Sequence, residues 1–224
     1  MTSQKKAKET NVLELLQIKP KTINQQKIFN SFDSDQHLFI HGFAGTGKTF
    51  IALYLALEAV LEHSDYDNVT IVRSAVPSRK QGFLPGNDTE KNEVFELPYY
   101  PLVGGLFNRP DAYKQLKSRE VIKFLSTSYL RGLTLNNSVI IVDEVQNMNF
   151  GEVDTIVTRT GDNCKLILIG DTRQNDLKYQ NEDSCIDRLC QTISRMKSFD
   201  QIEMGINDIC RNKVVKEWLI AQSV

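Results

Sequence analysis

Short runs of apolar residues recur along the chain, and helical or turn-like stretches separate them. Five runs have the length and β-branched content of strands, and they cover residues 37–41, 69–73, 139–143, 165–170 and 201–204. Runs as continuous as these are typical of strands that are covered on both faces. The pattern therefore predicts a parallel sheet.

Helical patterns occupy several of the intervening segments. Residues 23–32 can place four apolar side chains on one face, and residues 50–63 form a strongly apolar stretch that suits packing against the sheet. Residues 111–125 also have a helical pattern. The alternation of strand and helix predicts an α/β sandwich.

Residues 74–110 do not fit this alternation, because five prolines and four glycines interrupt them. A loop of this length inside a compact domain is usually functional. A surface insertion without a role is the alternative.

Composition and charge exclude several classes of protein. The 224 residues include 27 Lys and Arg against 28 Asp and Glu, so a uniformly basic nucleic-acid-binding protein is excluded. The four cysteines form no CxxC pair or metal-ligand spacing, which favours a reducing, cytoplasmic location. We expect neither a signal peptide nor a membrane span, because the first residues are polar and no apolar run approaches 18 residues.

The first chemical motif directly follows the strand predicted at residues 37–41. It reads Gly42-Phe43-Ala44-Gly45-Thr46-Gly47-Lys48-Thr49 and matches the phosphate loop G-x-x-x-x-G-K-[ST]. The glycines let backbone N–H groups approach a polyphosphate, and the next helix adds its positive N-terminal end. Lys48 is expected to contact the β- and γ-phosphates of ATP, and the Thr49 hydroxyl is expected to coordinate Mg²⁺.

Two adjacent carboxylates, Asp143 and Glu144, end another predicted strand. Buried charge is costly unless it has a partner, and Mg²⁺ held at the phosphate loop would supply one. We expect Asp143 to hold the ion through its water shell and Glu144 to orient or deprotonate the attacking water. A solvated strand end without chemistry is the alternative. The pair favours hydrolysis over phosphoryl transfer to a metabolite.

A third polar cluster follows the strand at residues 165–170, at an edge where α/β folds bind ligands. Its Gln174 can hydrogen-bond the γ-phosphate or the attacking water, although an ordinary turn would look similar. Arg131 and Arg211 are candidates for stabilising transition-state charge, and surface salt bridges are the alternative for each.

Six ordered motifs closely resemble those of the PhoH-like ATPases, which are related to the motor domains of superfamily-one helicases. The resemblance extends from about residue 24 to the C-terminus. The motifs are Asn24-Gln25, GFLPG at 82–86, YLRG at 129–132, DEVQN at 143–147, GDTRQ at 170–174 and DICR at 208–211. Leu133 departs from the pattern, because the family often has a second arginine there.

The resemblance implies a single RecA-like P-loop NTPase domain over residues 21–224, after an N-terminal tail over residues 1–20. It implies an α/β fold with a five-stranded parallel sheet, helices on both faces, and the 165–170 strand between the phosphate-loop and acidic strands. It also implies that Gln25 reads the adenine edge. Related helicases close two motor domains around ATP, and this chain has room for one. We therefore expect a homo-oligomeric ring, a hexamer as the family suggests, in which Arg131 or Arg211 acts in trans.

Hydrolysis can serve two purposes. The first is movement on single-stranded nucleic acid, RNA more than DNA. It is favoured by six basic residues against two acidic ones between residues 109 and 131. Further phosphate or stacking contacts are expected from Arg73, Arg79, Lys80, Phe83, Tyr99 and Tyr100. The alternative is that these charged residues form a solvated helix face and the aromatic residues belong to the core. The second purpose is an ATP-driven switch or scaffold that acts on a protein partner.

Overall fold

A computed structural model describes residues 13–34, 36–74, 93–130, 132–171 and 185–221. Its centre is a parallel six-stranded sheet with strand order β3-β2-β4-β5-β1-β6. The strands are β1 (His37–Gly42), β2 (Asn68–Arg73), β3 (Ile122–Ser126), β4 (Ser138–Asp143), β5 (Cys164–Gly170) and β6 (Phe199–Met204).

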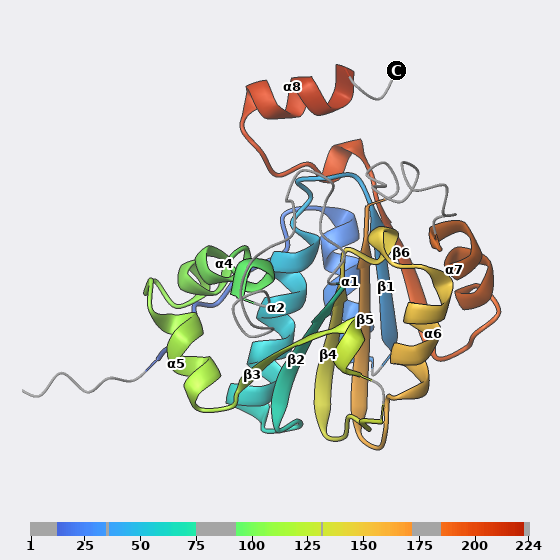
Figure 1. The fold of residues 1–224 in the computed structure, drawn as a ribbon. Helices are drawn as coiled ribbons and strands as arrows, with labels where there is room; N and C mark the ends of the chain where they lie inside the picture. Colours follow the sequence, from blue (N-terminus) through green and yellow to red (C-terminus); the bar gives the residue numbers. More distant parts are fainter. Residues whose placement is uncertain (1–12, 35, 75–92, 131, 172–184, 222–224) are drawn as a thin grey trace, which may run out of the picture.

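Helices cover both faces of the sheet (Figure 1). The α-helices are α1 (Ile23–Asp33), α2 (Lys48–Glu58), α4 (Tyr99–Leu106), α5 (Ala112–Ser118), α6 (Phe150–Thr158), α7 (Ile186–Ile193) and α8 (Lys213–Ala221). A π-helical segment, η1 (Ala59–His63), continues α2, and short 3-10 segments occur at η2 (Thr127–Tyr129), η3 (Val145–Asn147) and η5 (Ile206–Asp208).

Two apolar clusters, one on each face of the sheet, form the core. On one face α1, α2, α4 and α5 cover alternate strand residues such as Ile40 and Ile141, and on the other α6 and α7 cover their neighbours, such as Phe39 and Ile140. Burial on both faces explains why the central strands are apolar without alternation. The predicted α/β architecture with helices on both faces is confirmed.

All five predicted strands are present, as β1, β2, β4, β5 and β6, and β5 lies between β1 and β4 as expected. The predicted number of strands is wrong, because β3 adds a sixth. The helix expected over residues 111–125 is confirmed only for its first half, as α5. Beyond Ser118 the prediction is wrong, because Glu120 takes a left-handed φ of 59° and β3 follows. β3 is an edge strand that pairs with β2, and its Lys123 is exposed. The resulting mixture of polar and apolar residues resembles the pattern of an amphipathic helix.

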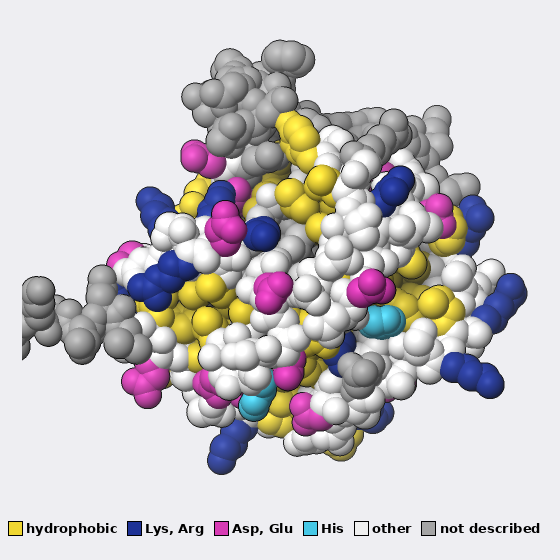
Figure 2. All heavy atoms as spheres, turned by 90° about the horizontal axis from the view of Figure 1, so that it is seen from below, with side chains coloured by type: hydrophobic (Ala, Val, Ile, Leu, Met, Phe, Trp, Pro, Cys, Tyr) yellow, Lys and Arg dark blue, Asp and Glu magenta, His cyan; other side chains and the backbone are white. Residues whose placement is uncertain are grey.

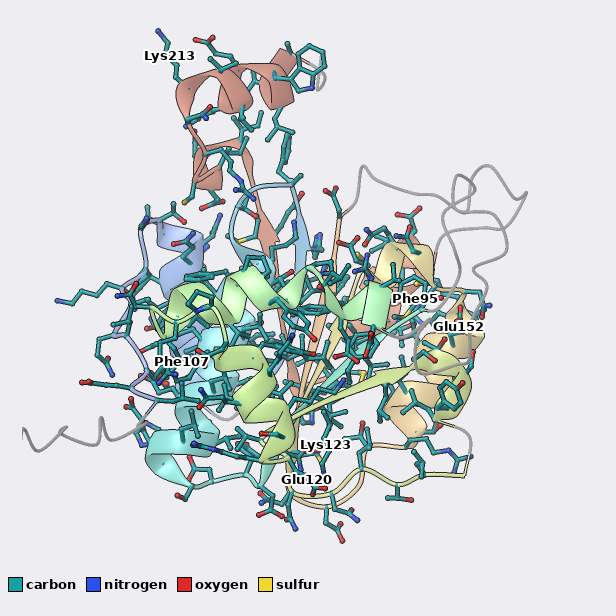
Figure 3. The ribbon with its side chains drawn as sticks, turned by 60° about the vertical axis from the view of Figure 1, so that its left-hand side comes forward. Phe95, Phe107, Glu120, Lys123, Glu152 and Lys213 are labelled. Atoms are coloured by element: carbon teal, nitrogen blue, oxygen red, sulfur yellow. The ribbon has the colours of Figure 1, made fainter. Side chains whose placement is uncertain are left out.

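The ends of the described chain differ in how they pack. Within the predicted tail, Leu15 is buried, and the Leu16 N–H donates to the Leu106 carbonyl at 2.8 Å. At the other end, α8 has no buried residue and stands away from the sheet, as Lys213 in Figure 3 illustrates. The domain boundary at residue 21 stays a prediction. No helix in the described ranges is long and apolar enough to cross a membrane.

Candidate nucleotide-binding site

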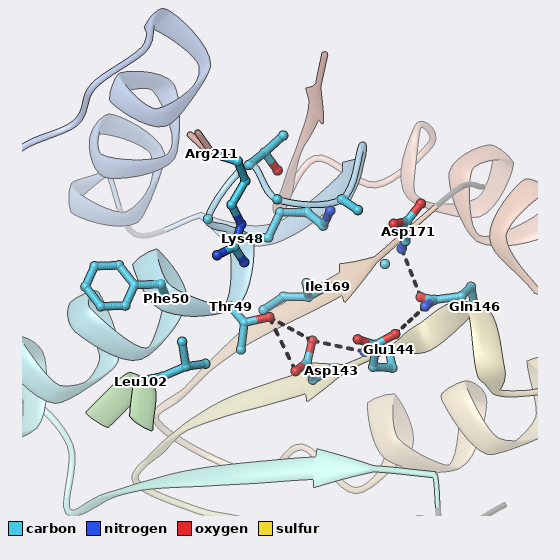
Figure 4. A pocket seen from close by; sticks show the side chains of 15 residues that line it. Lys48, Thr49, Phe50, Leu102, Asp143, Glu144, Gln146, Ile169, Asp171 and Arg211 are labelled. Atoms are coloured by element: carbon cyan, nitrogen blue, oxygen red, sulfur yellow. Dashed lines mark hydrogen bonds between the residues drawn. The ribbon is translucent and has the colours of Figure 1, made fainter. Parts of the chain in front are cut away.

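A pocket opens at the carboxyl ends of β1, β4 and β5, where the chain leaves the sheet (Figure 4). Its lining combines the phosphate loop, the acidic strand end and the residues that follow β5. The lining residues are Ala44, Gly45, Thr46, Gly47, Lys48, Thr49, Phe50, Leu102, Asp143, Glu144, Gln146, Ile169, Gly170, Asp171 and Arg211. The topology thus brings together motifs that are about 100 residues apart in the sequence.

The phosphate loop needs glycine for its shape. Gly42, Gly45 and Gly47 all have positive φ, at 115°, 73° and 86°. At Gly42 a Cβ atom would lie 2.2 Å from the Met204 carbonyl oxygen, so β6 leaves no room for a side chain there. Helix α2 begins directly after the loop at Lys48, and its N-terminal N–H groups therefore face the pocket.

Lys48 is buried, and its Nζ donates to the carbonyls of Gly42 at 3.0 Å and Phe43 at 2.7 Å. Burial lowers the pKa of this ammonium group, while Asp171, Asp143 and Glu144 oppose that shift. The lysine is therefore fixed at the loop, with three carboxylates acting on its charge.

The Asp143 carboxylate lies opposite the Thr49 hydroxyl, which donates to Asp143 Oδ1 at 3.2 Å. Burial raises the pKa of Asp143, and the charge of Arg73 and hydrogen bonds from Tyr99, Thr49 and the Glu144 N–H oppose this shift. Hard oxygen ligands are what Mg²⁺ prefers. A hydroxyl and a carboxylate that already face each other beside a lysine fit that ion.

Glu144 takes the left-handed conformation, with φ 58° and ψ 41°, which is uncommon for a residue with a side chain. This bend follows β4 directly. Gln146 Nε2 donates to the Glu144 carboxylate, and Gln146 Oε1 accepts the Asp171 N–H at 2.9 Å. Burial and the neighbouring Asp143 raise the pKa of Glu144, against Arg73, Gln146 and Lys48. A raised pKa makes a carboxylate a stronger general base.

Gln25 lies beneath the loop and is buried. Its Nε2 donates to the Thr46 carbonyl at 3.0 Å and to Cys210 Sγ at 3.3 Å, and its Oε1 accepts the Lys21 N–H at 2.8 Å. The side chain therefore braces the loop, and its contact with adenine stays a prediction.

Arg211 lines the pocket of its own chain, next to Gly45. The segment before it is anchored twice: the Cys210 N–H donates to the Gly45 carbonyl at 3.0 Å, and Asp208 accepts hydrogen bonds from Thr22 and Asn24. Its action in trans stays a prediction. Arg131, Gln174 and residues 82–86 lie outside the described part of the chain.

The structure also brings in side chains that the sequence analysis missed or misjudged. Tyr99 is buried, and its hydroxyl donates to Asp143 Oδ2 at 3.0 Å, so its expected role as a stacking platform for nucleic acid is wrong. Tyr100 stacks on Tyr113 with centroids 4.5 Å apart. Arg73 pairs in register with Asp143 on the adjacent strand. Gln146 belongs to the DEVQN motif, but the sequence analysis gave it no role of its own.

Comparison with known proteins identifies a family that the chain resembles over most of its length. The family model for PhoH-like proteins matches residues 17–222. The chain is 31% identical over 204 residues to a PhoH-like protein of Mycobacterium leprae, covering 89% of this chain and 57% of that protein. It is 36% identical over 165 residues to one from Synechocystis, covering 73% and 50%.

The large terminase of a thermophilic bacteriophage is a structural neighbour, with a TM-score of 0.49 at 16% identity, covering 89% of this chain and 50% of that one. The chain spans about half the length of the curated relatives it matches.

Proposed function

The chain belongs to the family of PhoH-like proteins, and from this membership and the geometry of the pocket we propose that it is a Mg²⁺-dependent ATPase. One observation carries the proposal. The Thr49 hydroxyl meets the Asp143 carboxylate at 3.2 Å, beside Lys48 and Glu144 in one pocket. A phosphate loop placed against an acidic strand end in this way is the arrangement that nucleotide hydrolysis requires.

Each residue has a separate task in this proposal. Lys48 and the N-terminal N–H groups of α2 bind the β- and γ-phosphates, and Thr49 and Asp143 hold Mg²⁺. The bound ion would neutralise charge on the phosphate oxygens. Glu144, oriented by Gln146, accepts the proton of the attacking water. We assign Gln174 to sensing the γ-phosphate and Arg211 or Arg131 to stabilising the transition state.

We further propose that hydrolysis is coupled to single-stranded nucleic acid, with RNA preferred. Exposed cations on α5 and after it, Lys114, Arg119 and Lys123, support this proposal. Fewer cations support nucleic-acid binding than the sequence indicated. Arg109 forms an ion pair with Asp111 at 3.0 Å, and Lys117 forms one with the buried Glu96 at 2.7 Å. The face at the amino ends of the strands is not uniformly basic. Lys and Arg side chains lie there among Asp and Glu side chains (Figure 2).

A protein partner is the second candidate. Helix α8 supports it, because Val214 and Trp218 are 74% and 65% exposed, and such apolar exposure on one helix is typical of interaction sites. In this reading the ATPase is a switch or scaffold that acts without nucleic acid.

The ring-shaped homo-oligomer, expected to be a hexamer, also stays a proposal, and so does the cytoplasmic location. All four cysteines are free thiols, which suits a reducing compartment. Light scattering coupled to size-exclusion chromatography, with and without ATP, measures the oligomeric state. A monomer under both conditions would contradict the ring.

Steady-state ATP hydrolysis, measured alone and with single-stranded RNA or DNA, separates the two candidates. Stimulation that falls steeply with salt is the expected result, because phosphate contacts release counterions. Hydrolysis that neither polymer changes would favour the protein partner. RNA binding by a fluorescent oligonucleotide, with Lys123→Glu beside Lys216→Glu as a control on α8, then tests the charged surface directly.

A further inference from the structure

The described donors to the proposed metal carboxylate include one side chain that no nucleotide motif contains. Tyr99 is the first residue of α4, its side chain is 1% exposed, and its hydroxyl donates to Asp143 Oδ2 at 3.0 Å. A buried hydroxyl bonded to a carboxylate is a strong, charge-assisted contact. It holds Oδ2 of Asp143, which the Thr49 hydroxyl also approaches at 3.4 Å.

The other oxygen of Asp143 is held differently. Oδ1 accepts the Thr49 hydroxyl at 3.2 Å and the Glu144 N–H at 3.1 Å. In the proposed loaded state the Thr49 oxygen would also be a ligand of Mg²⁺. The Tyr99 hydroxyl would have no such second task. Tyr99 is therefore suited to keep the carboxylate oriented whether or not the ion is bound.

The position of Tyr99 is itself constrained. Its ring lies 6.0 Å from that of Phe124 on β3, and α4 packs on α2, the helix that carries Lys48 and Thr49. Leu102, one turn further along α4, lines the pocket. The helix thus approaches the site with both a polar and an apolar side chain.

We propose that Tyr99 is a positioning residue of the metal site, whose hydroxyl holds the Asp143 carboxylate in the orientation that it shares with Thr49 toward Mg²⁺. This inference rests on the proposed ATPase function. Residues outside the first ligand shell commonly set metal affinity by orienting the ligands. The ordinary alternative is that Tyr99 buries a hydroxyl that simply needs an acceptor.

The chain offers a matched control for that alternative. Tyr113 lies on α5, which packs beside α4, and it is fully buried. Its hydroxyl donates to the Glu96 carboxylate at 3.2 Å. Glu96 pairs with Lys117 and does not line the nucleotide pocket. Tyr113→Phe therefore removes a comparable bond without touching Asp143.

The experiment compares Tyr99→Phe with Tyr113→Phe in the full chain. Binding of a fluorescent ATP analogue is followed by anisotropy while Mg²⁺ is titrated, and again in EDTA. We expect Tyr99→Phe to raise the Mg²⁺ concentration at half-saturation by about tenfold. Affinity in EDTA stays that of the wild type, and Tyr113→Phe changes neither value. In hydrolysis, Tyr99→Phe raises the KM for Mg²⁺ more than it lowers kcat at saturating Mg²⁺.

A double-mutant cycle with Asp143→Ala supplies a second readout, because Tyr99→Phe has no further effect on Mg²⁺ dependence once its partner is absent. Equal Mg²⁺ midpoints in the two tyrosine variants would overturn the inference. So would a loss of affinity in EDTA for Tyr99→Phe alone, since that loss indicates general packing. Wild-type protein that binds no nucleotide at any Mg²⁺ concentration would overturn the proposed function itself.

Discussion

Two buried lysines, at opposite ends of the sheet, differ in what surrounds them. Lys48 at the carboxyl end donates to the carbonyls of Gly42 and Phe43, and Lys165 at the amino end donates to those of Phe32 and Gln36. Lys48 lines a pocket with Asp143, Glu144 and Asp171, whereas Lys165 lies 4.6 Å from the ring centre of Phe32.

The hydrogen bonds of the two lysines are alike, so bonding alone does not distinguish a chemical role from a structural one. What differs is the space beside the charge. At the carboxyl end the polar groups face a pocket, and at the amino end the lysine closes the packing between α1 and β5. We therefore expect variants at the carboxyl end to lose activity, and variants at the amino end to lose stability.

The largest effect is expected at the carboxyl end for Glu144→Gln, which should lower kcat by ~10²–10⁴-fold because the general base is lost. Stability should not fall. The pKa of Glu144 is raised on folding, so the folded state binds the proton more readily, and the unfolding free energy decreases as pH rises from the ordinary value through the raised one.

The amide abolishes that contribution to the pH dependence. Urea unfolding at pH 5 and pH 8 in EDTA measures it, with Glu14→Gln, an exposed acid outside the pocket, as the control. A lower urea midpoint for Glu144→Gln than for the wild type at pH 8 would contradict this account.

The paired lysine variants come next. Lys48→Ala should lower kcat/KM for ATP by ~10²–10³-fold, because a preorganised donor to the phosphates is lost. Lys165→Met should leave kcat/KM unchanged and lower the unfolding free energy by about 1–3 kcal/mol, since two carbonyls lose their donor. Steady-state hydrolysis and urea unfolding of both variants measure the two effects. A loss of activity in Lys165→Met would contradict the expected difference between the two ends of the sheet.

Asp208 tests how the arginine segment is held. Burial by itself would raise its pKa, but hydrogen bonds from Thr22, Asn24 and the Gly205 N–H lower it overall. A carboxyl group with a depressed folded pKa stabilises the protein above its ordinary pKa and loses that contribution as pH falls. Asp208→Ala should cost about 2 kcal/mol at pH 7 and less at pH 3. A cost that does not depend on pH, measured by urea unfolding, would contradict this.

The smallest effect is expected for the first turn of α6. The Asn149 side chain caps this helix by accepting the Glu152 N–H at 3.0 Å. The Glu152 carboxylate in turn accepts the Asn149 N–H at 3.0 Å. Asn149→Ala should lower the unfolding free energy by about 1 kcal/mol and leave nucleotide affinity intact. Thermal melting and the anisotropy assay measure both quantities, with the exposed Asn30→Ala on α1 as a control.

The sequence predicted the elements whose burial is uniform. β1, β4 and β5 are covered on both faces, so their apolar runs were unambiguous, and the phosphate loop had a fixed order of residues. The prediction missed β3. This edge strand has an exposed Lys123, and only a short turn separates it from the seven-residue helix α5.

The site was predictable where one motif contains the chemistry, and less so where residues meet only in space. Thr49 and Asp143 were expected to act together, and their hydrogen bond brings them into contact. Tyr99 lies 44 residues from Asp143 in a segment rich in proline and glycine, where no local pattern points to the acidic strand. Its aromatic ring suggested stacking on nucleic acid, whereas the side chain is buried and donates a hydrogen bond to Asp143.

The most direct test of the account is steady-state hydrolysis of ATP by the wild-type chain in Mg²⁺ and in EDTA, with Lys48→Ala measured beside it and single-stranded RNA present throughout. We predict phosphate release that requires Mg²⁺ and is lost in Lys48→Ala. Release that survives in the variant or in EDTA, or its absence from the wild type in Mg²⁺, would contradict it.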